Sequence, residues 1–218
     1  MLNKLNTPPA DLLADAVANI PIIDTKISIN QPTGNFFYDK WEVKSEFTNT
    51  VWEEILNSLN VDEIGEARII KIDIESCYTK HADIDNRWHF PLVSNDGYLI
   101  DIKNKTMYEL DAGCWYYMDA GRPHSAVNFG CDARVHLVVR SLLNKGNITN
   151  PKKVRITTPD VYNARYLFDC HYSPLLNTLD KNYMIDKFNV IDSTTVEFYV
   201  DSTTLIPHYK GFIINEQE

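Results

Sequence analysis

The sequence contains no long apolar run, no closely spaced pair of cysteines and no cluster of basic residues. A membrane-spanning helix needs about 18 consecutive apolar residues, so none is expected. Because the four cysteines are widely spaced and the first residues lack the apolar core of a signal peptide, we expect a reducing, cytoplasmic location, in the host cell if a phage encodes the chain. With 30 acidic against 21 basic residues, nucleic acid is not an expected partner.

The composition that is present is typical of a packed globular protein. Hydrophobic residues make up 44% of the 218 residues and aromatic residues 11%, which is enough for a sizeable core. Neither internal repeats nor low-complexity segments occur, and a chain of this length is compatible with a single all-β domain. We therefore expect one domain with appendages and no second functional domain.

Two short helices are predicted ahead of the β-rich part of the chain. Residues 7–21 start with Thr-Pro-Pro and place apolar residues on one stripe, which is typical of an amphipathic helix that ends before Pro21. Thr50 and Glu53 form a capping-box pattern before a second apolar stripe. We expect both helices to brace one face of a sheet, and we assign residues 1–65 to this N-terminal helical support.

From Ala67 the period of the apolar residues changes to two, which predicts β-strands. Ile70, Ile72 and Ile74 alternate with charged residues. Further β-rich runs follow at 88–94, 97–102, 106–110, 114–118, 124–129 and 133–141. Asn95-Asp-Gly97, between two of these runs, is a strong hairpin pattern. We predict a mainly β core of short antiparallel strands over residues 66–141, arranged as a sandwich or open barrel.

The pattern weakens after residue 141. A helix-like stretch near 159–169 and a β-rich run at 196–200 predict an α+β arrangement for residues 142–218. We expect this part to be a C-terminal extension packed on the core.

A metal site is indicated by two histidines and one aspartate. His81 and Asp83 are two residues apart, so on extended backbone their side chains point to the same side. His124 follows a glycine turn at the start of a later strand, where it could complete the site. Two histidines and one carboxylate form the facial triad that binds non-haem Fe(II) and leaves positions open for other ligands. Taken alone, an H-x-D pair is more often a surface or capping pair.

Three further residues could bind an anion near that site. Arg134 begins an alternating strand, and an arginine on the inner face of a barrel is an uncompensated charge unless an anion meets it. Arg87 and His89 form another pair at spacing two, which we expect on the same face as the metal residues; the alternative is an exposed arginine and a core histidine. His136 shares the parity of Arg134, and for it a hydrogen-bonded core histidine is the favoured interpretation.

These residues, in this order, resemble a known family. The segments His81-Ala-Asp83, Arg87-Trp-His89-Phe-Pro-Leu92, Leu110-Asp-Ala-Gly113, Gly121-Arg-Pro-His124-Ser-Ala-Val-Asn128 and Arg134-Val-His-Leu137 are similar to the aspartyl/asparaginyl β-hydroxylase-like branch of the Fe(II)- and 2-oxoglutarate-dependent oxygenases, which includes proline hydroxylases. The resemblance covers roughly residues 66–141. It implies a double-stranded β-helix, a jelly-roll or cupin-like fold.

The resemblance also implies roles for the candidate residues. His81, Asp83 and His124 match the iron ligands, and Arg134 matches the arginine that binds the distal carboxylate of 2-oxoglutarate. Arg87 and His89 match residues near the carboxylate of the cosubstrate or substrate. The animal aspartyl β-hydroxylases have glycine where this chain has Asp83, so the complete triad is more like that of proline hydroxylases and of bacterial or phage members.

The function implied is hydroxylation of an amino acid, free or in a peptide, with Fe(II), 2-oxoglutarate and O2, and with release of succinate and CO2. Two alternatives stay open. One is a metal-dependent cupin isomerase or hydrolase, in which the same ligands hold another metal and a bound water. The other is a non-catalytic barrel that binds an acidic metabolite or a partner protein.

Overall fold

The computed structural model describes residues 1–34, 36, 39–62, 64–81, 83, 85–120, 122–142, 151–157, 186–192, 194–201 and 213–217. Contacts divide the chain into two compact units. The first, called the barrel unit here, consists of residues 1–80, 85–120 and 124–142, and the second, the C-terminal unit, of residues 81–84, 121–123 and 143–218. The three-part assignment made from the sequence stays a prediction. In the described part of the chain, no helix is both long and apolar enough to cross a membrane.

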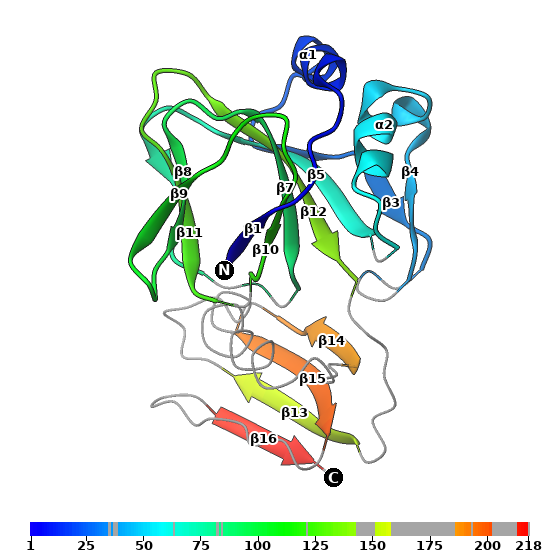
Figure 1. Cartoon of the computed structure of the whole chain (residues 1–218). Coiled ribbons are helices and arrows are strands. Elements are labelled where there is room, and N and C mark those ends of the chain that lie inside the picture. The colour runs from blue at the N-terminus through cyan, green and yellow to red at the C-terminus, as the bar shows by residue number, and fades with distance from the viewer. Residues whose placement is uncertain are drawn as a thin grey trace. The chain divides into compact units, whose positions relative to one another are not determined.

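The barrel unit is mainly β, as predicted (Figure 1). Its strands are β1 (Leu2–Lys4), β2 (Lys26–Ser28), β3 (Asn30–Pro32), β4 (Trp41–Val43), β5 (Ile64–Ile72), β6 (Ser76–Cys77), β7 (Arg87–Val93), β8 (Gly97–Asp101), β9 (Thr106–Glu109), β10 (Tyr116–Met118), β11 (His124–Asn128) and β12 (Arg134–Ser141). Its helices are α1 (Ala10–Ala18), the 3-10 turn η1 (Ser45–Phe47) and α2 (Val51–Ser58).

Ten of these strands form two antiparallel sheets whose order defines a double-stranded β-helix, and β3 and β4 form a separate two-stranded sheet. The larger sheet has the order β1-β10-β7-β12-β5-β2, and the smaller has the order β6-β11-β8-β9. From β5 to β12 the chain passes back and forth between these sheets, with β8 and β9 as the only consecutive pair in one sheet. Two sheets that enclose one interior in this way form a jelly roll. The predicted fold class is therefore confirmed.

The predicted helices are present and cover the outer face of the larger sheet. Ala16 of α1 and Ile55 of α2 are fully buried in one core cluster with Phe90, Leu137 and other residues of β7, β12 and β5. Figure 1 shows α2 beside β5 and the β3–β4 pair. Burying these apolar stripes is what holds such short helices, which are marginal in isolation.

The N-terminus of α2 differs in one detail from the expected capping box. Thr50 is the N-cap, and its hydroxyl oxygen accepts a hydrogen bond from the backbone N–H of Trp52 at 3.3 Å. The Glu53 carboxylate reaches past Thr50 and accepts from the backbone N–H of Asn49 at 2.7 Å. Both contacts satisfy free donors at the start of the helix, so the predicted boundary is correct.

Two expectations about the strands are wrong. Asn95-Asp-Gly97 forms a turn, with the N–H of Gly97 donating to the Ser94 carbonyl at 2.9 Å, but the strands that it joins, β7 and β8, lie in different sheets. The turn is therefore an arch that connects the two sheets and not a hairpin. Local turn chemistry does not decide which strands pair. Ile74 lies beyond the end of β5 and is 51% exposed, so the predicted alternation stops at Ile72.

The described strands of residues 143–218 in the C-terminal unit form an antiparallel sheet. Its strands are β13 (Pro151–Thr157), β14 (Asp186–Val190), β15 (Thr195–Asp201) and β16 (Ile213–Gln217), in the order β14-β15-β13-β16. The β-rich run predicted at 196–200 is confirmed as β15. The helix predicted near 159–169 lies outside the described residues.

Candidate active site

The inner face of the larger sheet is lined by polar side chains. Partners directly opposite one another in an antiparallel register share a face. Arg134 of β12 pairs with Ile72 of β5, and His89 of β7 pairs with Tyr116 of β10. Ile72 and Tyr116 belong to the core cluster that also contains Leu99 of the smaller sheet, so this face points into the space between the sheets.

The register between β7 and β12 places further polar residues on the same face. His89 lies opposite Val138, and Arg87 lies opposite Arg140, both on β12. With a side-chain period of two, Arg134, His136, Val138 and Arg140 point inward together with Arg87 and His89. The side chains at the intervening positions, such as Phe90 and Leu137, pack against the helices.

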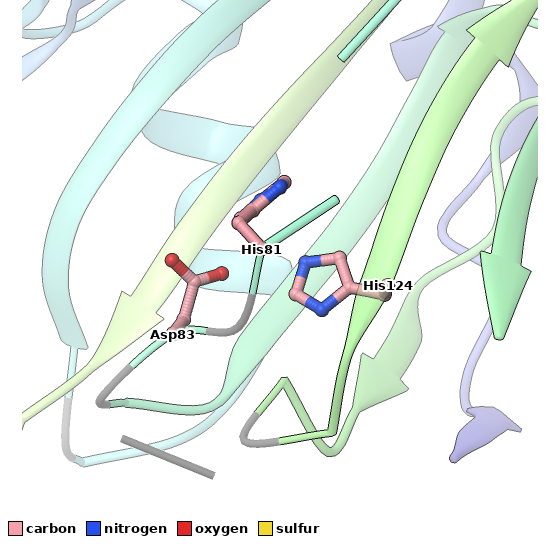
Figure 2. A group of neighbouring side chains, drawn as sticks. All are labelled: His81, Asp83 and His124. Atoms are coloured by element: carbon pink, nitrogen blue, oxygen red, sulfur yellow. The ribbon is translucent and has the colours of Figure 1, made fainter. Parts of the chain in front are cut away.

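His81, Asp83 and His124 form a group that could hold a metal ion, called the candidate metal group here (Figure 2). Each offers one ligand atom, and these atoms all lie within 4.8 Å of one another. His124 is the first residue of β11 and lies opposite Asp101, in phase with the inward-facing pair Ala126 and Leu99. His81 and Asp83 are half-buried, whereas His124 is buried.

The donor set of this group fits a divalent transition metal with open positions. Two imidazole nitrogens and one carboxylate oxygen suit iron, and the same set can also accept zinc or manganese. Within the described residues, it is the one group of three or more such side chains whose ligand atoms come together in this way. The fold thus brings together three residues, the first and last of which are 43 positions apart in the sequence.

Arg134 is buried on the inner face, and its side chain crosses toward the smaller sheet. Only 3% of the residue is exposed. A Cβ atom on Gly97 of β8 would lie 2.9 Å from Cγ of Arg134 and closer still to its Cδ, so the stem of this arginine rests directly on the glycine backbone. Glycine at position 97 is required by this close approach and not by its backbone conformation, since its φ is not positive.

The guanidinium group of Arg134 has no anionic partner among the described residues. Its Nη2 donates to Nδ1 of His136 at 3.1 Å, and its buried Nε has no hydrogen-bond acceptor in that part of the chain. Burial lowers the pKa of Arg134 to about 10, and the nearby Tyr78 offsets part of this change. The group still carries its positive charge at neutral pH, so the site is complementary to an anion.

His136 is neutral and has a defined tautomer. Arginine is only a donor, so Nδ1 of His136 must accept and the ring proton must be on Nε2. Complete burial lowers the pKa of His136 well below its usual range, and the charges of Arg134 and His89 lower it further. The rings of His89 and His136 meet edge to face, with centroids 5.8 Å apart. His136 therefore orients Arg134 without competing for the anion.

Arg87 differs from Arg134 because the protein supplies it with a carboxylate. Asp85, whose side chain is fully buried, forms an ion pair with Arg87. The same carboxylate accepts hydrogen bonds from Nε of Arg140 at 2.7 Å and from its Nη2. Arg87 and His89 are both at least 94% buried on the inner face. Of the described arginines on this face, Arg134 is therefore the one without a carboxylate partner.

Two residues that contribute to this face are not identified from the sequence. His136, which shares the parity of Arg134, is the buried and hydrogen-bonded histidine that the sequence predicts. Arg140 has the same parity on β12, six residues after Arg134, so extending the alternation would find it. Asp85 carries no signal, because its burial depends on a loop that brings it against two strands.

The family comparison agrees with the resemblance seen in the sequence. Residues 39–142, slightly less than half of the chain, match the family model described as aspartyl/asparaginyl β-hydroxylase. This match supports the suspected branch and a hydroxylase. All six predicted site residues lie within the matched segment. No curated protein matches the chain in sequence.

Solved structures with a similar fold are distant. An oxidoreductase of the 2OG-Fe(II) oxygenase family from Burkholderia pseudomallei has 15% identity and a TM-score of 0.46, over 63% of this chain and 80% of that one. The viral collagen prolyl hydroxylase of Paramecium Bursaria Chlorella virus-1 has 12% identity and a TM-score of 0.44, over 65% and 96%. The polyketide cyclase RemF from Streptomyces resistomycificus has 14% identity and a TM-score of 0.32, over 39% of this chain and 58% of its own length. At such values these likenesses carry no argument about function.

Proposed function

We propose that this chain is an Fe(II)- and 2-oxoglutarate-dependent oxygenase that hydroxylates an amino acid, free or within a peptide. The observation that carries the proposal is the combination of the candidate metal group with a buried arginine that meets no anion among the described residues. A metal group alone would suit a cupin isomerase equally well, and a buried arginine alone would suit a barrel that only binds an anion. Both features lie within the segment that matches the family model, and this match supports a hydroxylase.

His81, Asp83 and His124 would hold the iron, which when bound supplies the redox chemistry for oxidative decarboxylation of 2-oxoglutarate and oxygen insertion. The protein's own contribution is geometry. Burial of His124 and partial burial of His81 and Asp83 limit the access of water to the metal position. Low water access favours reaction with the substrate over side reactions.

Arg134 would bind the distal carboxylate of 2-oxoglutarate. A carboxylate matches the planar fork of a guanidinium, and charge-assisted hydrogen bonds are about twice as strong as neutral ones. A bound carboxylate would also compensate the buried charge of Arg134. Burial lowers the pKa of this residue to about 10. His136 holds the fork through Nη2 and leaves its other edge for the ligand.

Arg87 and His89 would border the position of the substrate or the cosubstrate. Both lie on the inner face with Arg134, and His89 contacts the ring of His136. An amino-acid substrate carries a carboxylate or an amide carbonyl, and either would accept from these donors. The ion pair with Asp85 holds the guanidinium of Arg87 at this face.

The direct test is turnover of the purified protein. With Fe(II), 2-oxoglutarate and oxygen, we expect succinate to form, and formation should rise when a mixture of amino acids and short peptides contains a substrate. Mass spectrometry should detect a product heavier by one oxygen, and labelled O2 should supply that atom. Iron binding without succinate under any condition would favour a non-catalytic barrel. Turnover that needs zinc or manganese but no 2-oxoglutarate would favour the cupin isomerase or hydrolase.

A second test concerns the packing of Gly97 beneath Arg134. In Gly97→Ala the new methyl group would occupy the space of the arginine stem, so the guanidinium must shift. We expect the affinity for 2-oxoglutarate to fall about tenfold, the equivalent of one charge-assisted hydrogen bond. Iron affinity should stay within about twofold. Unchanged 2-oxoglutarate affinity in this variant would show that the position of Arg134 does not matter for binding.

A further inference from the structure

The segment that carries His81 and Asp83 joins β6 to β7, and its first end is fixed to the strand of His124. The backbone N–H of Tyr78 donates to the carbonyl of Ala126 at 2.8 Å. The hydroxyl of Ser125 donates to the carbonyl of Tyr78 at 2.6 Å. Ser125 directly follows His124 on β11, so this end of the segment is held beside the third residue of the candidate metal group.

The other end of the segment is fixed to β12. The N–H of Ser141 donates to the carbonyl of Asn86 at 2.9 Å, and the Ser141 hydroxyl accepts from the N–H of Asn86 at 3.1 Å. Next to this pair, the carboxylate of Asp85 meets both Arg140 of β12 and Arg87 of β7. The guanidinium of Arg140 also lies 4.3 Å from the ring centroid of Phe36, which restricts it further.

Asp85 is buried, so its contacts with the two arginines must compensate its charge. Its side chain is fully buried, and the side chains of Arg87 and Arg140 are 7% and 6% exposed. A buried carboxylate is tolerated only when cations and donors surround it, so its position is determined by the two arginines. Those arginines lie opposite each other in the register of adjacent strands, which fixes the distance between them. Asp85 cannot move without breaking its ion pairs with both.

From this arrangement we infer that Asp85 is a positioning residue for the metal site: clamped between Arg87 and Arg140, it fixes the end of the segment that presents His81 and Asp83. The inference rests on the proposed function, since it assumes that these two side chains bind the metal. Asp85 is two residues from Asp83 in the chain, so its ion pairs anchor the backbone close to this ligand. Residues hydrogen-bonded to metal ligands typically contribute about 10–100-fold to metal affinity, and we expect an effect of this size from Asp85.

The test measures metal affinity and folding in the same variants. Arg140→Gln removes one of the two cations while Asp85 keeps Arg87, and Asp85→Glu keeps the charge but lengthens the side chain by one methylene. Anaerobic titration with Fe(II), and with Co(II) followed by its absorption bands, should show affinity reduced by about 10–100-fold in both variants. The Co(II) spectrum should also change, because the ligands are no longer held in one arrangement. Circular dichroism and the Tm report the fold.

Asp111→Asn is the matched control, because Asp111 forms an exposed ion pair with Lys4 at 2.7 Å. It should bind metal as the parent does. Parent-like affinity and spectrum in folded Arg140→Gln and Asp85→Glu would overturn the inference. Global unfolding of both variants would overturn it as well, since the role assigned to Asp85 is local. A parent protein that binds no metal at His81, Asp83 and His124 would instead refute the proposed function.

Discussion

His124→Ala is expected to abolish metal binding and turnover while the barrel stays folded. His124 is one of three side chains whose ligand atoms lie within 4.8 Å of one another, so two donors remain in the variant. Loss of a direct ligand should cost more than the roughly 10–100-fold that is typical of residues behind the ligands. The hydrophobic clusters on both faces of the larger sheet do not include His124, so they stay intact. Anaerobic Fe(II) titration and circular dichroism measure the two effects.

His136→Ala is the matched comparison for this exchange. Like His124, His136 is a buried histidine of the barrel unit, but it contacts Arg134 and is not part of the candidate metal group. It should retain the iron affinity of the parent within a few-fold. His81→Ala should behave like His124→Ala. If either His81→Ala or His124→Ala bound iron as tightly as the parent, the ligand assignment would be wrong.

Arg134→Met is expected to weaken 2-oxoglutarate binding by about one to two orders of magnitude, because each hydrogen bond to a charged group contributes about 1.5–3 kcal/mol. Methionine retains an apolar stem over Gly97 but removes the fork. Iron affinity should change much less. The absorption band of the ternary complex with iron and 2-oxoglutarate reports cosubstrate binding, and anaerobic titration reports iron.

Two comparisons separate loss of the anion contact from general damage. Arg134→Lys keeps the charge without the planar fork, so its affinity should lie between those of the parent and of Arg134→Met. Pyruvate has the 2-oxo acid group but no distal carboxylate, so its weaker binding should be the same in all three proteins. Equal losses of iron and 2-oxoglutarate would indicate a folding defect, and normal 2-oxoglutarate affinity would favour the cupin alternative.

Much of the barrel could be predicted because its strands are amphipathic in a regular way. In β5 and β12 alternate residues face either the helices or the interior, and this two-sided burial imposes period two on the sequence. The pairing of strands could not be predicted in the same way. Asn95-Asp-Gly97 is a good turn in a hairpin and in an arch, and only the packing of the two sheets decides between them.

The residues of the candidate site also differ in whether the sequence predicts them. His124 and Arg134 are recognisable because their side-chain chemistry is unusual for the strand positions that they occupy, and His81 and Asp83 by their spacing of two. Asp85 is not, because an aspartate in a polar loop is unremarkable until the fold places it between two buried arginines. The contact of Arg134 with Gly97 depends likewise on the distance between the sheets, which no local pattern encodes.

That contact makes positions 97 and 134 interdependent in any mutational history of the barrel. A side chain at position 97 would overlap the stem of Arg134, so a substitution of the glycine displaces the arginine for as long as the arginine is present. Loss of the arginine, in contrast, does not require any change at position 97. The order of the two substitutions is therefore constrained, and directed evolution toward cosubstrates without a distal carboxylate should alter Arg134 first and Gly97 second.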